Sequence, residues 1–168
     1  MIRPAEDWIA ALIVAVLALM IAGNCQAEEV HLLPEEAVSI DLRAIRDIES
    51  GGNARAYNKR SGATGAFQIT QPVIDDFNTA YPKRGLKLND MYNEERAAQI
   101  SSWYLHERIP QMLNAYKIPV TQDSVLAAYN AGVGKMKKSH RSGAPLPAET
   151  VEYQKRYKKA LAKYLNAV

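Results

Sequence analysis

The apolar residues of this chain recur with the 3.6-residue period of an α-helix, and this spacing constrains the fold most strongly. Val38, Leu42, Ile45 and Ile48 follow it after Pro34, a residue that suits the first turn of a helix. No stretch of useful length alternates apolar and polar residues, as a strand with one buried face would. The sequence therefore predicts an all-α fold whose first helix begins near Pro34.

Four further helices are expected from capping residues and apolar periodicity. They run from Thr70 to Ala80, from Asp90 or Asn93 to about Arg108, from Thr121 to about Gly132, and from Ala148 to about Asn166. Pro110 should end or kink the second of them, because proline lacks the amide hydrogen that a helix interior needs. The last helix is expected to bury a stripe made of Val151, Tyr157, Leu161 and Leu165.

Two segments carry polar residues that need an interpretation. Residues 51–65 are rich in glycine, asparagine and serine and lack a helical or strand period, so a loop is expected there. Asp75 and Asp76 lie near the start of the helix that follows Thr70. Acids favour the positive end of a helix, and we interpret this pair as helix-start acids rather than as a catalytic pair.

The first 27 residues are expected to be a secretory leader. Residues 8–22 form an unbroken apolar run that is shorter than the about 20 residues a membrane-spanning helix needs. A polar region begins after Ala27, so cleavage is predicted there and residues 28–168 would form the functional domain.

Two alternatives for this segment stay open. Glu6 and Asp7 outweigh Arg3 ahead of the apolar run, where a leader is normally positive, which allows a retained membrane anchor. Cys25 follows a sequence that loosely resembles a lipoprotein signal, which allows a lipid-modified cysteine.

Several classes of site lack support in the sequence. Cys25 is the only cysteine, which excludes an internal disulfide and a thiolate metal cluster. The three histidines are scattered, with no second His and no Cys three or four residues from any of them, so a zinc site or a Ser-His-Asp triad is not expected. Gly132 and Gly134 follow no strand and do not form a phosphate-binding loop. No metal or cofactor is expected.

The chain carries 21 Lys and Arg against 18 Asp and Glu, and the excess of three lies mainly in its last third. A basic surface can bind nucleic acid, anionic lipid or an anionic wall polymer. An exported protein seldom meets nucleic acid, so the wall or the membrane surface is the expected partner. An ordinary solvated helix face is the alternative.

Glu49 is the candidate catalytic acid. It follows Ile45 by four residues, beside the buried stripe, and Ser50 and two glycines come directly after it. A carboxylate at this negative helix end is disfavoured by up to about 1 kcal/mol, which a solvated surface Glu could tolerate. A glycosidase acid must instead stay protonated near neutral pH, and burial against Ile45, Ile48, Phe67 or Tyr129 would raise its pKa.

Four motifs, in this order and spacing, resemble the catalytic domain of the soluble lytic transglycosylases. They are Glu49-Ser50, Gly65-Ala66-Phe67-Gln68-Ile69, Ala128-Tyr129-Asn130-Ala131-Gly132, and Leu146-Pro147 with Glu149-Thr150 and Tyr153. The resemblance spans about residues 40–165. It implies a lysozyme-like domain that cleaves the β-1,4 bond between N-acetylmuramic acid and N-acetylglucosamine in peptidoglycan, in the periplasm or cell envelope of a bacterium.

The same resemblance implies a role for each matching residue. Glu49 would be the sole catalytic carboxylate, acting first as acid and then as base, while the muramic acid 6-hydroxyl closes a 1,6-anhydro ring. Gln68 would bind near the substrate acetamido group, and Tyr129 and Asn130 would line the cleft. Ser50 would bind sugar or cap its helix. Glu149 and Tyr153 would close the cleft, although Glu149 also fits a plain helix-start acid. Phe67 and the Thr70-Gln71-Pro72 segment depart from the family pattern.

Two other functions remain open. In a goose-type lysozyme-like hydrolase, water would replace the 6-hydroxyl and a second carboxylate such as Glu149 or Asp75 would activate it. A wall-binding or assembly module could keep the fold without catalysis. The small size is similar to that of enzymes that accompany secretion or conjugation machinery or phages.

Overall fold

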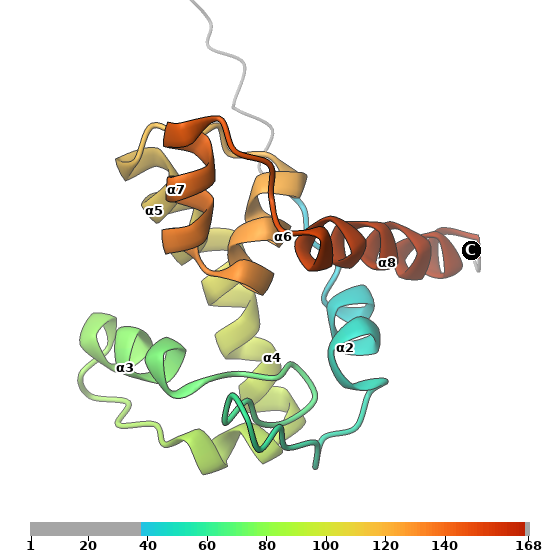
Figure 1. The fold of residues 1–168 in the computed structure, drawn as a ribbon. Helices are drawn as coiled ribbons and strands as arrows, with labels where there is room; N and C mark the ends of the chain where they lie inside the picture. Colours follow the sequence, from blue (N-terminus) through green and yellow to red (C-terminus); the bar gives the residue numbers. More distant parts are fainter. Residues whose placement is uncertain (1–37, 167–168) are drawn as a thin grey trace, which may run out of the picture. The chain divides into compact units, whose positions relative to one another are not determined.

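The computed structural model describes residues 38–166, and the fold they form is all-α, which confirms the predicted class. The helices of this part are α2 (Leu42–Ser50), α3 (Gln71–Ala80), α4 (Glu94–Trp103), α5 (Ile109–Ala115), α6 (Gln122–Ala131), α7 (Val133–Ser142) and α8 (Ala148–Leu165) (Figure 1). Within these residues, pairing of the strand type is limited to isolated bridges in the 57–69 segment. The expected leader and Cys25 lie outside the described residues. None of the described helices is long and apolar enough to cross a bilayer.

Helix α2 begins later than predicted. Residues 38–41 are not helical, so a continuous helix from near Pro34 is wrong. The Asp41 side chain caps α2 by accepting a hydrogen bond from the Arg43 amide at 2.8 Å. The Asp41 amide in turn donates to the Tyr157 hydroxyl of α8 at 2.8 Å. This long-range bond gives the Asp41 amide a partner outside the helix, which local periodicity could not reveal.

Helix α3 starts after Thr70 and ends at Ala80, as predicted, but its two aspartates are not in its first turn. Asp76 forms an ion pair with Arg108, whose Nε lies 2.6 Å from a carboxylate oxygen. Asp75 accepts a hydrogen bond from the side-chain amide of Gln71 at 2.7 Å. The interpretation as helix-start acids is therefore wrong, because Asp76 joins α3 to the turn that follows α4.

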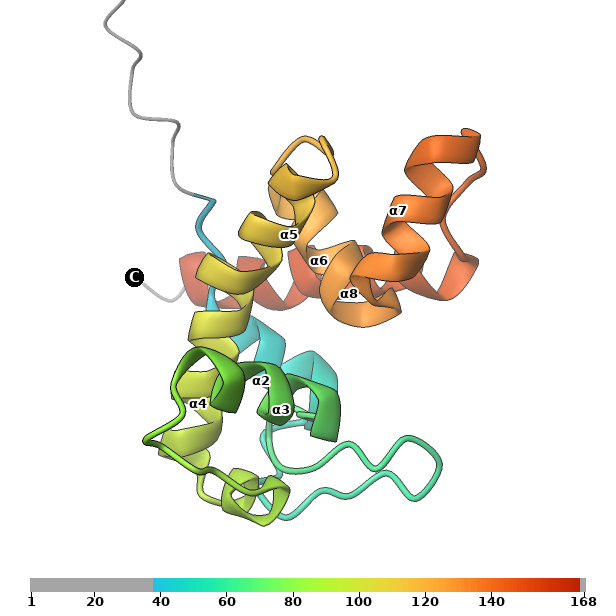
Figure 2. The same cartoon turned by 90° about the vertical axis from the view of Figure 1, so that its left-hand side faces the viewer.

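The predicted helix end near Arg108 is also wrong. Asn93 caps α4, as one of the two expected starts, but the helical path continues through a π-helical turn at Tyr104–Arg108 into α5. Pro110 lies in the first turn of α5. A π turn widens the backbone, and just before a proline it accommodates the missing amide hydrogen without stopping the helix. In Figure 2, α4 and α5 accordingly follow one another as one long column.

Helix α6 is capped as predicted by Thr121, whose hydroxyl accepts a hydrogen bond from the Ser124 amide at 3.1 Å. Gly132 then adopts a φ of 86°, and a further helix, α7, follows at once. Helix α7 was not predicted, because Val133 is its only buried residue and its polar remainder has no apolar period. Its cations include Lys135, Lys138 and Arg141, which are exposed, and it contains no acid.

Helix α8 has the predicted bounds, but its buried face matches the expected stripe only in part, at Tyr157 and Leu161. Its buried residues are Thr150, Tyr153, Tyr157 and Ala160, and they pack toward α2 and α6. Val151 and Leu165 of the expected stripe are instead 38% and 66% exposed. The expected stripe left out Tyr153, whose ring can be buried because its hydroxyl finds a partner, Glu49, on α2.

Candidate active site

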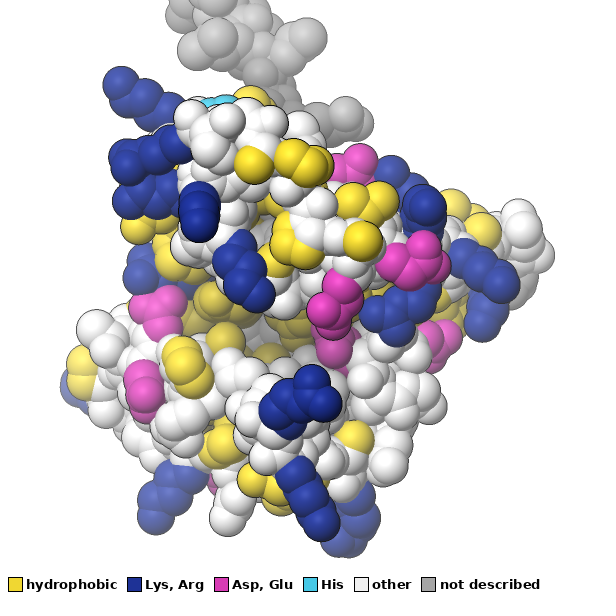
Figure 3. All heavy atoms as spheres, viewed as in Figure 1, with side chains coloured by type: hydrophobic (Ala, Val, Ile, Leu, Met, Phe, Trp, Pro, Cys, Tyr) yellow, Lys and Arg dark blue, Asp and Glu magenta, His cyan; other side chains and the backbone are white. Residues whose placement is uncertain are grey.

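A cleft of about 500 Å³ crosses the domain between the 58–73 segment and the facing ends of α6 and α8. It opens on the face shown in Figure 3 as a hollow between a lower part and an upper part. Five predicted site residues line it: Glu49, Gln68, Tyr129, Asn130 and Glu149. Residues from four separate parts of the chain thus meet in one place.

Glu49 lies in the last turn of α2, with its side chain in the cleft. Gly51 ends the helix in a left-handed conformation, with φ of 64°, and its amide closes the helix on the carbonyl groups of Arg46 and Asp47. Glycine suits this position because it has no Cβ to clash. The helix therefore ends one residue after Glu49, which places the carboxyl group at the edge of the domain interior.

Burial raises the pKa of the Glu49 carboxyl group from its ordinary 4.5 to about 7. Two weaker effects oppose this shift: a hydrogen bond from the Tyr153 hydroxyl to Oε1 at 2.7 Å, and the positive charge of Arg156. Both favour the ionised form. With a pKa near 7, the group can give up a proton and take it back at neutral pH.

Tyr153 lies behind this carboxyl group and not on the surface of the cleft. Its side chain is fully buried on α8, and burial together with the neighbouring Glu49 raises the pKa of its own hydroxyl. It therefore stays a neutral hydrogen-bond donor. The structure places Tyr153 where it orients Glu49, which differs from the expected position closing the cleft.

Gln68 belongs to a tight turn that glycine makes feasible. Gly65 has φ of 79°, and a Cβ on it would lie 2.0 Å from the carbonyl oxygen of Met91. Gln68 has φ of 50°, a left-handed conformation that costs free energy for a residue with a side chain. Its amide nitrogen donates to the Gly65 carbonyl at 3.0 Å, which fixes the side chain and leaves its amide oxygen toward other partners.

Of the remaining predicted residues, some line the cleft and others hold the elements around it in place. Ser50 does not line the cleft; its hydroxyl donates to the Ala66 carbonyl at 2.8 Å and ties α2 to the turn before Gln68. Tyr129 lines the cleft, donates to the Phe67 carbonyl at 2.9 Å, and has its pKa raised by burial. Asn130 lies beside it at the end of α6.

Glu149 is exposed in the first turn of α8, on the opposite side of the same cleft. This position also fits a helix-start acid. Asp75, the other carboxylate considered for a hydrolase, does not line the cleft. Within residues 38–166, no group of His, Asp and Glu side chains is arranged to hold a metal ion.

Four polar residues of the cleft were not predicted as site residues, namely Asn58, Ser61, Thr70 and Tyr104. Asn58 and Ser61 come from the loop that precedes Gly65, which has no period to assign their direction. The ring centroid of Tyr104 lies 6.0 Å from that of Tyr129, and its side chain lines the cleft. Only the packing of the π-helical turn Tyr104–Arg108 against α6 could reveal this.

Comparison with known proteins gives one match. No significant match was found among the curated proteins or among the solved structures. Residues 35–150 match the family model described as "Transglycosylase SLT domain", and this range covers well over half of the chain and includes every cleft residue named above. The chain therefore belongs to the transglycosylase SLT domain family, a lysozyme-like family of lytic-transglycosylase type that acts on peptidoglycan.

Proposed function

We propose that this protein is a lytic transglycosylase that cleaves the N-acetylmuramic acid to N-acetylglucosamine β-1,4 bond of peptidoglycan and leaves a 1,6-anhydro-N-acetylmuramic acid end. One observation carries the proposal: a carboxyl group with a pKa of about 7 lies at the base of an open cleft. Burying an ionisable group in this way costs free energy, so a module that only binds the wall would gain nothing from it.

The reaction uses Glu49 twice. Its protonated carboxyl group gives the proton to the bridging oxygen as the bond from that oxygen to C1 breaks, and the acetamido group of the substrate stabilises the positive charge at C1. The resulting carboxylate takes the proton of the 6-hydroxyl while that oxygen bonds to C1. The acid is thereby regenerated, and no water is consumed.

The surrounding residues support both halves of this cycle. The Tyr153 hydroxyl, 2.7 Å from Oε1, stabilises the carboxylate that exists between the two proton transfers. The amide oxygen of Gln68 can accept a hydrogen bond from the acetamido N–H and so fix the sugar in the cleft. We extend the proposal to export across the inner membrane, because the substrate lies outside it.

A hydrolase is the second candidate, and Glu149 favours it, since this carboxylate lines the same cleft as Glu49. In that reaction Glu149 would activate a water molecule that attacks C1. The released sugar would then have a reducing end.

Digestion of purified peptidoglycan in heavy-oxygen water, followed by mass spectrometry, tests the proposal. A transglycosylase releases fragments that are one water lighter and carry no label at C1. Glu49→Gln should give no product, and Gln68→Ala should give the same product more slowly. Glu149→Gln should leave the product unchanged, with Glu152→Gln, an exposed acid one turn further along α8, as its control. Labelled reducing muramic acid as the main product would refute the proposal and favour the hydrolase.

A further inference from the structure

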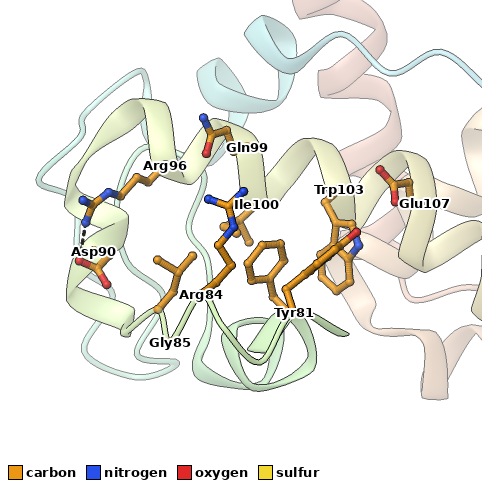
Figure 4. Close-up of a pocket in the computed structure, with 11 residues that line it drawn as sticks. Tyr81, Arg84, Gly85, Asp90, Arg96, Gln99, Ile100, Trp103 and Glu107 are labelled. Carbon is orange, nitrogen blue, oxygen red and sulfur yellow. Dashed lines mark hydrogen bonds and ion pairs between the residues drawn. The ribbon is translucent and has the colours of Figure 1, made fainter. Parts of the chain in front are cut away.

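A second cavity, of about 630 Å³, lies between the end of α3, the 81–90 segment and α4 (Figure 4). It is larger than the cleft of Glu49 and shares no lining residue with it. The catalytic steps proposed above use none of its residues. The residues that line this cavity nevertheless favour a specific kind of ligand.

Its floor is aromatic. Phe77 packs edge-on against Trp103, with ring centroids 5.1 Å apart at an interplanar angle of 84°, and its centroid lies 4.8 Å from that of Tyr81. Trp103 is 8% exposed and is held by this packing, whereas Tyr81 is 42% exposed and offers its ring to a ligand. Such rings bind the apolar parts of a ligand at little entropic cost, because they are already fixed.

Two of the four charged side chains that line the cavity form an ion pair, and the other two lie on either side of Trp103. Arg96 is neutralised by Asp90, at 2.8 Å, whereas Arg84 forms no ion pair and no side-chain hydrogen bond with the described residues. Glu107 likewise has no cationic partner among them and lies on the far side of Trp103 from Arg84 (Figure 4). Arg84 and Glu107, which have no charged partner within residues 38–166, therefore lie at opposite ends of an aromatic floor.

We propose that this cavity binds a short peptide that carries both a free carboxylate and a free amine, namely the peptide stem attached to the glycan strand. The inference rests on the proposed function for the identity of the ligand. Arg84 would bind the carboxylate and Glu107 the ammonium group. A polyanion would be repelled by Glu107, and an uncharged glycan would leave both charges without a partner.

The two sites are close enough for one substrate. Val73 of α3 lines the catalytic cleft and Phe77, four residues further along the same helix, lines the second cavity. Four residues of helix correspond to about 6 Å. An extended peptide of four residues spans up to about 14 Å, so a stem on a sugar in the cleft can pass over α3 into the cavity.

Calorimetry with a synthetic stem tetrapeptide, without sugar, tests the inference. The peptide should bind the full chain, and Arg84→Gln and Glu107→Gln should each weaken binding by about tenfold. The matched controls are Arg55→Gln and Glu95→Gln, which change exposed residues outside both cavities and should leave the affinity unchanged.

Altered peptides assign each charge to its partner. Amidation of the peptide's C-terminal carboxylate should weaken its binding to the unchanged protein but should not weaken its binding to the Arg84→Gln variant any further. Acetylation of the peptide's amine should likewise weaken binding to the unchanged protein but not to the Glu107→Gln variant. Equal affinity for all peptides, or for all variants, would overturn the inference. Product analysis on peptide-free glycan distinguishes the two proposals. Release of anhydro ends by a protein that does not bind the peptide would refute only the proposed peptide site. Peptide binding without anhydro ends would refute only the transglycosylase reaction.

Discussion

Replacing Glu49 by Gln is predicted to stabilise the fold at alkaline pH while it abolishes wall cleavage. Gln has nearly the same shape, and its amide oxygen can still accept the hydrogen bond that the Tyr153 hydroxyl gives to Oε1 at 2.7 Å. What the substitution removes is the ability to donate a proton and to become charged. Activity and stability should therefore change in opposite directions.

The magnitude follows from the pKa shift. Burial raises the pKa of Glu49 from 4.5 to about 7, so the folded chain holds this proton more tightly than the unfolded chain does. A raised carboxyl pKa means that the free energy of unfolding falls as the pH rises from the unfolded value through the folded one. Each pKa unit corresponds to about 1.4 kcal/mol, so the complete loss above the folded pKa is on the order of 3 kcal/mol. Glu49→Gln should recover that loss.

Denaturant unfolding of both proteins across this pH range provides the assay. The difference in the free energy of unfolding should be close to zero below the unfolded pKa and should grow to about 3 kcal/mol near pH 8. Glu95→Gln, at an exposed position of α4, should show no such growth. A difference that does not depend on pH, or a Glu49→Gln protein that is less stable near pH 8, would show that the carboxyl group is not desolvated and would refute its assignment as the acid.

Three further predictions concern the support of the site and the leader. Tyr153→Phe removes a hydrogen bond that lowers the pKa of Glu49, so the alkaline limb of the pH–rate profile should move to higher pH; an unmoved limb would show that the bond does not tune the acid. Gly65→Ala should cost about 3 kcal/mol or more in denaturant unfolding, because its Cβ meets a carbonyl oxygen at 2.0 Å, whereas Gly62→Ala, with φ of 72° and open space, should cost about 1 kcal/mol; equal costs would contradict the contact. N-terminal sequencing of exported protein should begin at Glu28, and recovery of intact Met1 in membranes would favour the anchor.

Much of the fold was predictable because the signals that start and end a helix lie close together in the sequence. Helix caps depend on residues within about one turn, so the sequence alone identifies the N-caps Asn93 and Thr121 and the C-cap Gly51. The failures have local causes as well. Helix α7 has too few apolar residues to show a period, and a π turn lets the helix pass Pro110, where proline chemistry predicts an end.

The candidate acid was also predictable, since Glu49 lies beside an apolar stripe at a helix end. Burial was also expected to raise its pKa, but the hydrogen bond that opposes this rise was not predictable, because it joins distant parts of the chain. Tyr153, which lies 104 residues further along, donates to its carboxylate. Ser50 joins α2 to a turn 16 residues away, and Asp76 pairs with Arg108 across 32 residues. Periodicity reports which face of a helix is apolar, but burial and hydrogen bonding depend on what packs against that face, and this is a property of the folded chain.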